Sequence, residues 1–129
     1  FKTGAVRIAA AAGVPIVPTV LWGTHRMMTK GHDKDFSRGK TIAIRCGEPM
    51  HPTGDDPVGE TADLRARMST LLDEAIAGYP ADEQPPGSWW LPARFGGSAP
   101  TLEEAEALEA AEKRERASRR AAKRAQKND

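Results

Sequence analysis

The sequence predicts an α/β fold in which strands are covered by helices, followed by an extended segment and a charged C-terminal helix. An alanine-rich run ends at Gly13 and is followed by an apolar, β-branched run, Val14 to Trp22. Apolar and polar residues then alternate from Lys40 to Gly47, and helical spacing of apolar residues follows between Leu64 and Ile76. Periods of 2 and about 3.6 residues that alternate along a chain are typical of strands packed against helices.

The first predicted helix covers residues 2 to about 12. Its alanine-rich composition favours a helix, and Gly13 can adopt the left-handed conformation that ends one. Val14 to Trp22 is then short and apolar enough for a buried strand. Pro15 and Pro18 cannot donate hydrogen bonds to a neighbouring strand, so we expect an edge strand or one that starts near Ile16.

Residues 23–39 are polar and predict a loop, after which residues 40–47 predict a half-buried strand. Ile42, Ile44 and Cys46 share one face of this strand, and we expect that face to be buried. Cys46 is the chain's single cysteine, which excludes an intrachain disulfide and fits a reducing cytosol. Its expected role is packing.

Residues 48–59 contain three prolines and two glycines, which predict an irregular connection. The helix that follows is expected to have Asp63 near its start and Gly78 near its end. Two strands make a poor sheet on their own, so we expect further strands N-terminal to this sequence. The apolar stripe of the helix consists of Leu64, Met68, Leu71, Leu72, Ala75 and Ile76.

Composition divides the chain into residues 1–79, 80–100 and 101–129. The first part is globular, and the second is rich in Pro and Gly but carries Trp89, Trp90 and Phe95, so we expect an ordered or surface-docking segment. The third begins with Thr101 and Glu104, which form a capping box, and predicts a long charged helix.

Basic residues concentrate at the end of this helix, where Lys113 to Lys127 holds eight basic residues and one acid. They cover one side of a helix and alanines cover another. This pattern is compatible with a tether to an anionic membrane surface or with a solvated tail. Binding of nucleic acid is not expected, because no recognised fold for base readout accompanies the basic stripe.

No apolar run approaches the roughly 20 residues that span a bilayer, and no signal peptide is visible. The run His32-Asp33-Lys34-Asp35 offers metal ligands, but Lys34 opposes a cation and no second cluster completes a site. No metal site is therefore expected. The sequence also contains no Gly-rich nucleotide-binding loop.

Two motifs in the first 18 residues resemble the last block of the glycerolipid acyltransferase family. Phe1-Lys2-Thr3-Gly4-Ala5 resembles its FKxGA helix, and Val14-Pro15-Ile16-Val17-Pro18 resembles its VPhhP strand, where h is apolar. The segment Trp89 to Arg94 more loosely resembles actinobacterial members. The resemblance covers residues 1 to 50 well and the last helix not at all.

The resemblance implies the C-terminal part of a mixed sheet covered by helices, in a peripheral enzyme on the cytoplasmic face of the cell membrane. It implies acyl transfer from acyl-CoA or acyl carrier protein to the lysophospholipid 1-acyl-sn-glycerol-3-phosphate, giving phosphatidic acid without a cofactor. Family members carry a catalytic HxxxxD motif and an EGTRS-like segment well before FKxGA. We expect both upstream of Phe1, so this chain is expected to be a fragment without catalytic residues and inactive alone. His51 and Asp56 match HxxxxD formally, but they follow FKxGA in a loop, and we interpret the match as coincidence.

The resemblance assigns acyl-donor binding to Val14, Pro15, Ile16, Val17 and Pro18, although core packing explains the apolar members equally well. Gly4 at a helix start allows close approach of a backbone or a phosphate, and Lys2 adds a positive charge, unless it is an exposed surface lysine. His25 and Arg26 follow the strand end, where sites gather in α/β sheets, and are candidates for anion contacts or simple loop residues. A noncatalytic module whose basic helix binds anionic membrane or RNA is the alternative function.

Overall fold

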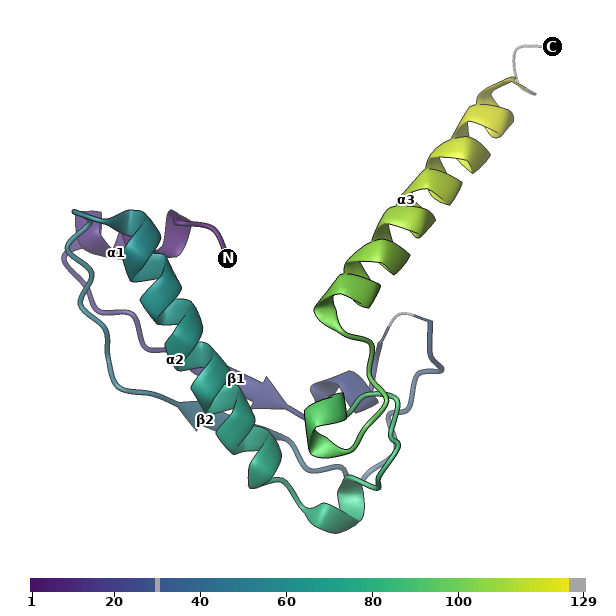
Figure 1. Ribbon diagram of the computed structural model, residues 1–129, viewed down its shortest axis with the longest axis horizontal. Coiled ribbons are helices and arrows are strands. Elements are labelled where there is room, and N and C mark those ends of the chain that lie inside the picture. The colour runs from purple at the N-terminus through teal and green to yellow at the C-terminus, as the bar shows by residue number, and fades with distance from the viewer. Residues whose placement is uncertain (30, 126–129) are drawn as a thin grey trace. The chain divides into compact units, whose positions relative to one another are not determined.

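The computed structural model describes residues 1–29 and 31–125, and the chain divides into two compact units. Phe1–Gln84 forms the first unit and the second begins at Pro85 (Figure 1). The first unit contains two helices, α1 and α2, and a two-stranded antiparallel sheet of β1 and β2. The coarse prediction of an α/β fold is therefore confirmed.

Helix α1 spans Gly4–Ala12 and ends as the sequence predicts. Gly13 has φ 65° and ψ 31°, in the left-handed region. The N–H of Gly13 donates to the carbonyl of Ala10 at 3.1 Å, and the N–H of Val14 donates to that of Ala9 at 3.1 Å. These bonds satisfy the last carbonyls of the helix and turn the chain into the next segment.

Strands β1 (Thr19–Trp22) and β2 (Ala43–Cys46) pair with Leu21 opposite Ile44. Upstream of β1, the N–H of Ile16 donates to the carbonyl of Met50, and the N–H of Met50 donates back, both at 2.8 Å. Ile16 thus forms an isolated bridge with Met50, whereas the strand itself begins at Thr19, later than predicted. Pro18 contributes only its carbonyl, which accepts from the N–H of Gly47 at 2.8 Å.

Helix α2 spans Pro57–Ala77 and begins earlier than predicted. Asp56 is its N-cap, because the Asp56 Oδ1 atom accepts from the N–H of Gly59 at 3.0 Å. Pro57 occupies the first turn, where its missing N–H removes no helical bond. The Pro/Gly-rich stretch that predicted an irregular connection therefore ends in a helix start. Gly78 caps the other end, as expected.

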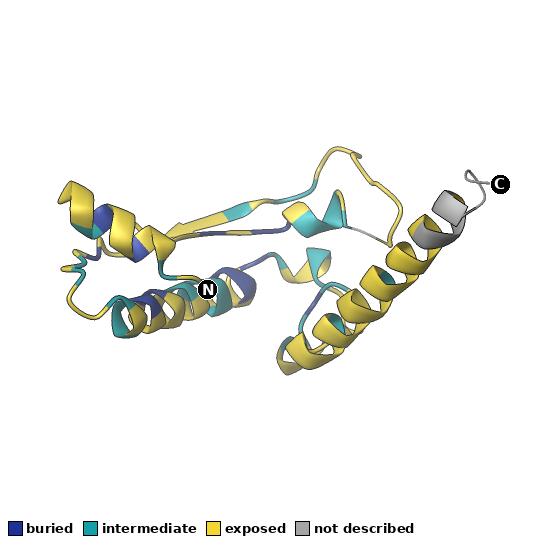
Figure 2. Cartoon of the chain, turned by 90° about the horizontal axis from the view of Figure 1, so that it is seen from above, coloured by how far each residue is buried: buried dark blue, intermediate teal, exposed yellow. Residues whose placement is uncertain are grey.

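The core of the first unit lies between the two helices and one face of the sheet. Val6 of α1, Met50 and Leu64 of α2 form one buried cluster, with Ile16 and Met68 packed against it. Towards the other end of α2, the buried residues are Val20, Trp22, Ala75, Ile76 and Tyr79. Figure 2 shows this inward-facing burial along α2. The core thus uses the predicted stripe of α2.

The other face of the sheet is exposed, which corrects the prediction for β2. Leu21 and Ile44, opposite each other, have exposed fractions of 52% and 60%, and Ile42 one of 43%. Cys46 is also exposed, so the expected packing role is wrong. Side chains of β2 do alternate between two faces, as predicted. However, α2 packs on the face of Ala43 and Arg45, which is not the face that was predicted to be buried. An added Cβ at Gly78 would lie 3.0 Å from Arg45 Nη2, so the arginine side chain reaches the end of α2.

In the second unit, hydrogen bonds join residues 87–91 to residues 96–99. The N–H of Gly87 donates to the carbonyl of Gly96 at 2.8 Å, and the N–H of Ala99 donates to that of Leu91 at 3.0 Å. Helix α3 then spans Leu102–Ala125. Its capping box is confirmed: the N–H of Thr101 donates to Glu104 Oε2 at 2.7 Å, and the N–H of Glu104 donates to Thr101 Oγ1 at 3.2 Å. The predicted extension over 126–129, including Lys127, lies outside the described residues.

Candidate functional site

Strand β1 has a different kind of site at each end. At its carboxyl end lies a polar cluster, which we call the strand-end cluster: Gly23, Arg26, Thr41, Tyr79 and Glu83. Arg26 Nη1 donates to Glu83 Oε2 at 2.5 Å and to the Tyr79 hydroxyl at 2.7 Å. The Tyr79 hydroxyl donates to the carbonyl of Thr41 at 2.5 Å. These bonds join the loop between the strands to the segment that follows α2.

Gly23 is required in this cluster by both conformation and space. Its φ of 104° lies in the region that favours glycine. A Cβ at this position would stand 2.4 Å from the carbonyl oxygen of Thr41 and 2.8 Å from the Tyr79 hydroxyl. Tyr79 is 4% exposed, so it has little room to move away. The close approach of the backbone to Tyr79 therefore depends on the missing side chain.

Glu83 is held in its ionised form by the cluster. Thr41 Oγ1 donates to Glu83 Oε1 at 2.5 Å, and the Thr41 N–H donates to Oε2 at 3.0 Å. These bonds, together with the Arg26 guanidinium, lower the pKa of Glu83 from 4.5 to about 2. The negative charge of Glu83 thus neutralises Arg26 within the protein.

His25 lies beside the cluster in a short 3₁₀ helix, Thr24–Arg26. Its ring centroid is 4.3 Å from that of Trp22, with a tilt of 53°. Burial and the neighbouring charge of Arg26 lower the pKa of His25 below its ordinary 6.5. The indole N–H of Trp22 donates to Gln84 Oε1 at 3.1 Å, and Gln84 Nε2 donates to the carbonyl of Ile76 at 2.9 Å.

These contacts bear on the two residues predicted to bind anions at this strand end. Arg26 is bound to Glu83, so an anionic ligand would have to displace an internal carboxylate. His25 is half-buried, and its lowered pKa favours the neutral imidazole near pH 7. The geometry gives both residues a role in fixing the loop.

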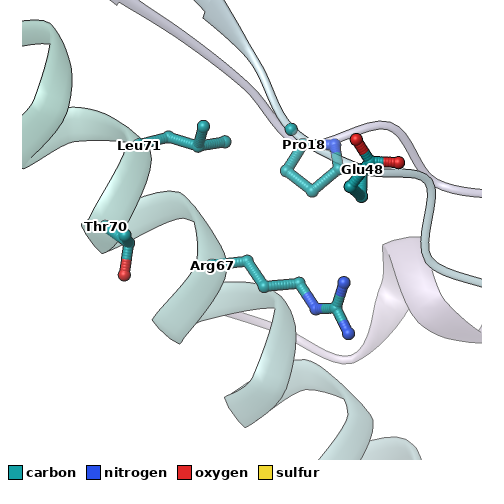
Figure 3. Close-up of a pocket in the computed structure, with 6 residues that line it drawn as sticks. Pro18, Glu48, Arg67, Thr70 and Leu71 are labelled. Carbon is teal, nitrogen blue, oxygen red and sulfur yellow. The ribbon is translucent and has the colours of Figure 1, made fainter.

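The other end of β1 has an open pocket of about 230 Å³. Buried Pro18 forms part of its wall, together with Leu71 of α2 (Figure 3). An added Cβ at Gly47 would lie 2.9 Å from Leu71 Cδ1, so the absence of a side chain there lets the helix approach the strand. Its lining residues are Pro18, Gly47, Glu48, Arg67, Thr70 and Leu71.

The polar groups of this Pro18 pocket are Arg67 and Thr70 on α2 and Glu48 beyond β2. In Figure 3 the Arg67 side chain extends from α2 towards the pocket, and Glu48 and Pro18 lie opposite. Arg67 Nε donates to Asp63 Oδ2 at 3.0 Å, and its side chain remains 43% exposed. The pocket therefore combines an apolar wall with the carboxylate of Glu48 and with a solvent-accessible guanidinium that is paired with Asp63.

The remaining residues assigned to donor binding have different environments. Ile16 packs against the core, whereas Val14 and Val17 are 49% and 51% exposed and Pro15 is also exposed. Pro18 alone of the five lines the pocket. The structure thus separates the VPhhP stretch into a core residue, a pocket residue and three exposed ones.

Lys2 and Gly4 lie at the start of α1, where both are exposed. A Cβ at Gly4 would meet nothing within 4 Å, so in the described residues no backbone uses the close approach that a glycine allows. Next to them, the Arg65 guanidinium lies 5.9 Å from the ring centroid of Phe1. The proposed phosphate contact of Lys2 remains a prediction.

Asp56 has a structural role as the N-cap of α2, and His51 is exposed. This agrees with the interpretation of His51 and Asp56 as a coincidental match. Across residues 1–29 and 31–125, no group of three or more His, Cys, Asp or Glu side chains is arranged to hold a metal ion.

Sequence reasoning missed Thr41, Tyr79, Glu83 and Arg67. Thr41 meets Tyr79 across 38 residues of sequence and Glu83 across 42, and no local pattern indicates such pairs. Arg67 lay on the polar face of a predicted helix, where an arginine is ordinary. In the strand-end cluster, a local sequence signal was available only for Gly23, because a glycine directly after a predicted strand indicates a turn.

Comparison of the chain with protein-family models, with curated proteins and with solved structures found no match. No described helix has the length and apolar character needed to cross a membrane.

Proposed function

We propose that the chain forms the rear part of a glycerolipid acyltransferase. The complete enzyme would transfer a fatty acyl group from acyl-CoA or acyl carrier protein to 1-acyl-sn-glycerol-3-phosphate. The acceptor hydroxyl attacks the thioester carbonyl, the carbon–sulfur bond breaks, and the proton of the hydroxyl ends on the departing thiol. The base for this step would be the histidine of an HxxxxD motif upstream of Phe1.

The observation that carries the proposal is the local structure of the two motifs. FKxGA opens α1 at Gly4, and a left-handed turn at Gly13 leads directly into the VPhhP stretch. Ile16 of that stretch pairs with Met50, and the stretch leads directly into β1, with Pro18 at an open pocket. A helix, a tight turn and a strand in this order are what the resemblance implies.

The uncovered face of the sheet supports a larger mixed sheet around this unit. Leu21 and Ile44 lie side by side on it and are both more than half exposed. Two-stranded sheets are marginal in water, and further strands or helices of the same domain would bury this apolar surface. We therefore propose that this unit is the C-terminal part of a larger mixed sheet covered by helices.

We assign the acyl-donor contact to the Pro18 pocket. Pro18 and Leu71 offer the apolar wall that a thioester chain needs, and Arg67 offers a cation for a phosphate of coenzyme A or of the carrier's prosthetic arm. Contact with the acyl donor would thus give Pro18 a role beyond its effect on strand pairing. Arg26 is not part of this assignment, because Glu83 already binds it.

The test is acyl transfer by the protein encoded by the entire reading frame. We expect HxxxxD and EGTRS-like segments in the coding sequence upstream of Phe1, and no acyl transfer from residues 1–129 alone. In the complete protein, Arg67→Gln should raise KM for acyl-CoA about tenfold, the typical worth of one charged contact. Arg65→Gln, two residues away on α2, is the matched control and should leave KM unchanged.

Unrelated sequence upstream of Phe1, or acyl transfer by residues 1–129 alone, would refute the assignment as a rear portion of this enzyme. An unchanged KM in Arg67→Gln would remove the pocket from the donor site while leaving the enzyme class intact.

A further inference from the structure

Helix α3 has exposed side chains along most of its length. From Leu102 to Arg120, every position is exposed except Ala105 and Glu112, which are intermediate, and Figure 2 shows it in yellow along most of its length. Leu102 and Leu108 are 67% and 64% exposed. A helix of 24 residues held at its start by a capping box is thus available to a partner.

The charges of α3 are separated along its axis. Residues 102–112 carry five glutamates and no base, whereas residues 113–124 carry seven Lys or Arg and one glutamate. Two of the bases are already paired on the helix, Arg116 with Glu112 at 2.9 Å and Arg119 with Glu115 at 2.6 Å. Lys113, Arg120 and Lys123 make no such pair among the described residues, and at 100° per residue they share one side of the helix.

The length of the basic half allows it to act apart from the acidic half. Twelve residues rise about 18 Å along the axis, more than twice the Debye length of about 8 Å at physiological salt. A surface that touches the basic half is therefore screened from most of the glutamates. The alanines between the bases are too small for deep insertion, so contact would remain at the surface.

We infer that residues 113–124 of α3 dock the protein on an anionic lipid bilayer. The charge complementarity is independent of the enzyme assignment, but the choice of a bilayer over a nucleic acid rests on the proposed function, whose acceptor is a lipid. A bilayer offers many negative charges in a plane to one side of a helix, and each Lys or Arg near it raises affinity about fivefold.

The experiment is vesicle sedimentation with the 129-residue chain. Vesicles of phosphatidylcholine with about one-third phosphatidylglycerol should bind it at low salt and release it at high salt, and pure phosphatidylcholine should not bind it. The triple variant Lys113→Gln, Arg120→Gln and Lys123→Gln should lose about a hundredfold in affinity. Circular dichroism confirms that α3 still forms in this variant.

The matched control removes the same charge from the first unit, through Arg7→Gln, Lys34→Gln and Arg38→Gln. It should bind anionic vesicles like the unchanged chain. Equal loss in both triple variants, equal binding to neutral vesicles, or tighter binding to a single-stranded RNA than to anionic vesicles at the same salt would overturn the inference. Because the assay contains no acyl donor, its outcome is separate from that of the acyl-transfer test.

Discussion

The two ends of β1 each present an arginine, and the two arginines differ in what surrounds them. Arg26, at the carboxyl end, is 18% exposed and binds Glu83 and Tyr79. Arg67, at the amino end of the strand, is 43% exposed, binds Asp63 through Nε and faces an open pocket. The first arginine is part of the framework that closes the loop, and the second is the more exposed one and lines the pocket that we propose for the acyl donor.

The comparison shows that position at a strand end does not by itself make a binding residue. Carboxyl ends of strands gather sites in α/β sheets, which is why His25 and Arg26 were candidates. In this chain the charge of Arg26 is neutralised by an internal carboxylate instead. Arg67 also pairs with a carboxylate, that of Asp63, but its side chain is 43% exposed. It lies at the opposite end of the strand, on a helix face that the sequence analysis did not single out.

The largest expected effect comes from Gly23→Ala, which breaks the strand-end cluster sterically. The strained φ costs about 1–3 kcal/mol, and the contact with Thr41 and Tyr79 adds to it. We expect a loss of more than about 3 kcal/mol in the free energy of unfolding, measured by urea denaturation. Gly13→Ala is the control, because that glycine also has positive φ but no atom within 4 Å of an added Cβ. Equal losses would show that Gly23 makes no essential close approach.

Tyr79→Phe tests the same end of β1 without changing its shape. The variant removes the hydroxyl that accepts from Arg26 and donates to the carbonyl of Thr41. We expect a loss of about 1–3 kcal/mol, because the carbonyl and the guanidinium each lose a partner. Thermal unfolding measures it. A loss below about 0.5 kcal/mol would mean that water replaces the hydroxyl at no cost.

The pH dependence of stability tests Glu83, which shares a lowered pKa with Asp35, Glu60 and Glu104 elsewhere in the chain. The pKa of Glu83 is lowered from 4.5 to about 2 in the folded protein, so its contribution is present above pH 4.5 and disappears as the pH falls towards 2. The lowered pKa of His25 costs stability already below pH 6.5. Unfolding measured from pH 7 to pH 3 should therefore show two declines.

In Glu83→Gln the loss of stability at acid pH, below pH 4.5, should become shallower. The loss that begins below pH 6.5 should persist. The variant is also expected to be less stable at pH 7, because Arg26 loses its countercharge. An unchanged acid slope in this variant would contradict the assigned role of Glu83.

The smallest effect is expected at the Pro18 pocket, where Arg67→Gln should change the free energy of unfolding by about 0.5 kcal/mol or less. Its ion pair with Asp63 is an exposed contact between residues four apart on a helix, and such pairs contribute little. Urea denaturation checks this against Arg65→Gln. A loss above about 1 kcal/mol would make Arg67 part of the framework.

Local features of the fold were predictable from sequence, because each depends on neighbouring residues. Gly13 ends α1, and Thr101 with Glu104 opens α3. The early start of α2 was not predicted, because Asp56 and Pro57 are as typical of a loop as they are of a helix N-cap and the first helical turn.

Features that depend on distant contacts were not predictable. The alternation in β2 marks two faces but does not say which one meets a helix, and Ile44 and Cys46 fell on the exposed face. Likewise, Arg26 meets Glu83 across 57 residues of sequence. For the candidate site, the sequence indicated Pro18 through a resemblance, but the pocket and Arg67 required the packing of α2 against β1.

The most direct test of the contrast between the two strand ends is a single thermal-unfolding experiment on Arg26→Gln and Arg67→Gln side by side at pH 7. Arg26→Gln should lower Tm by about 5–10 °C, and Arg67→Gln by less than about 3 °C. Equal shifts, or a larger shift for Arg67→Gln, would contradict the division of β1 into an end where the arginine holds the framework and an end where it does not.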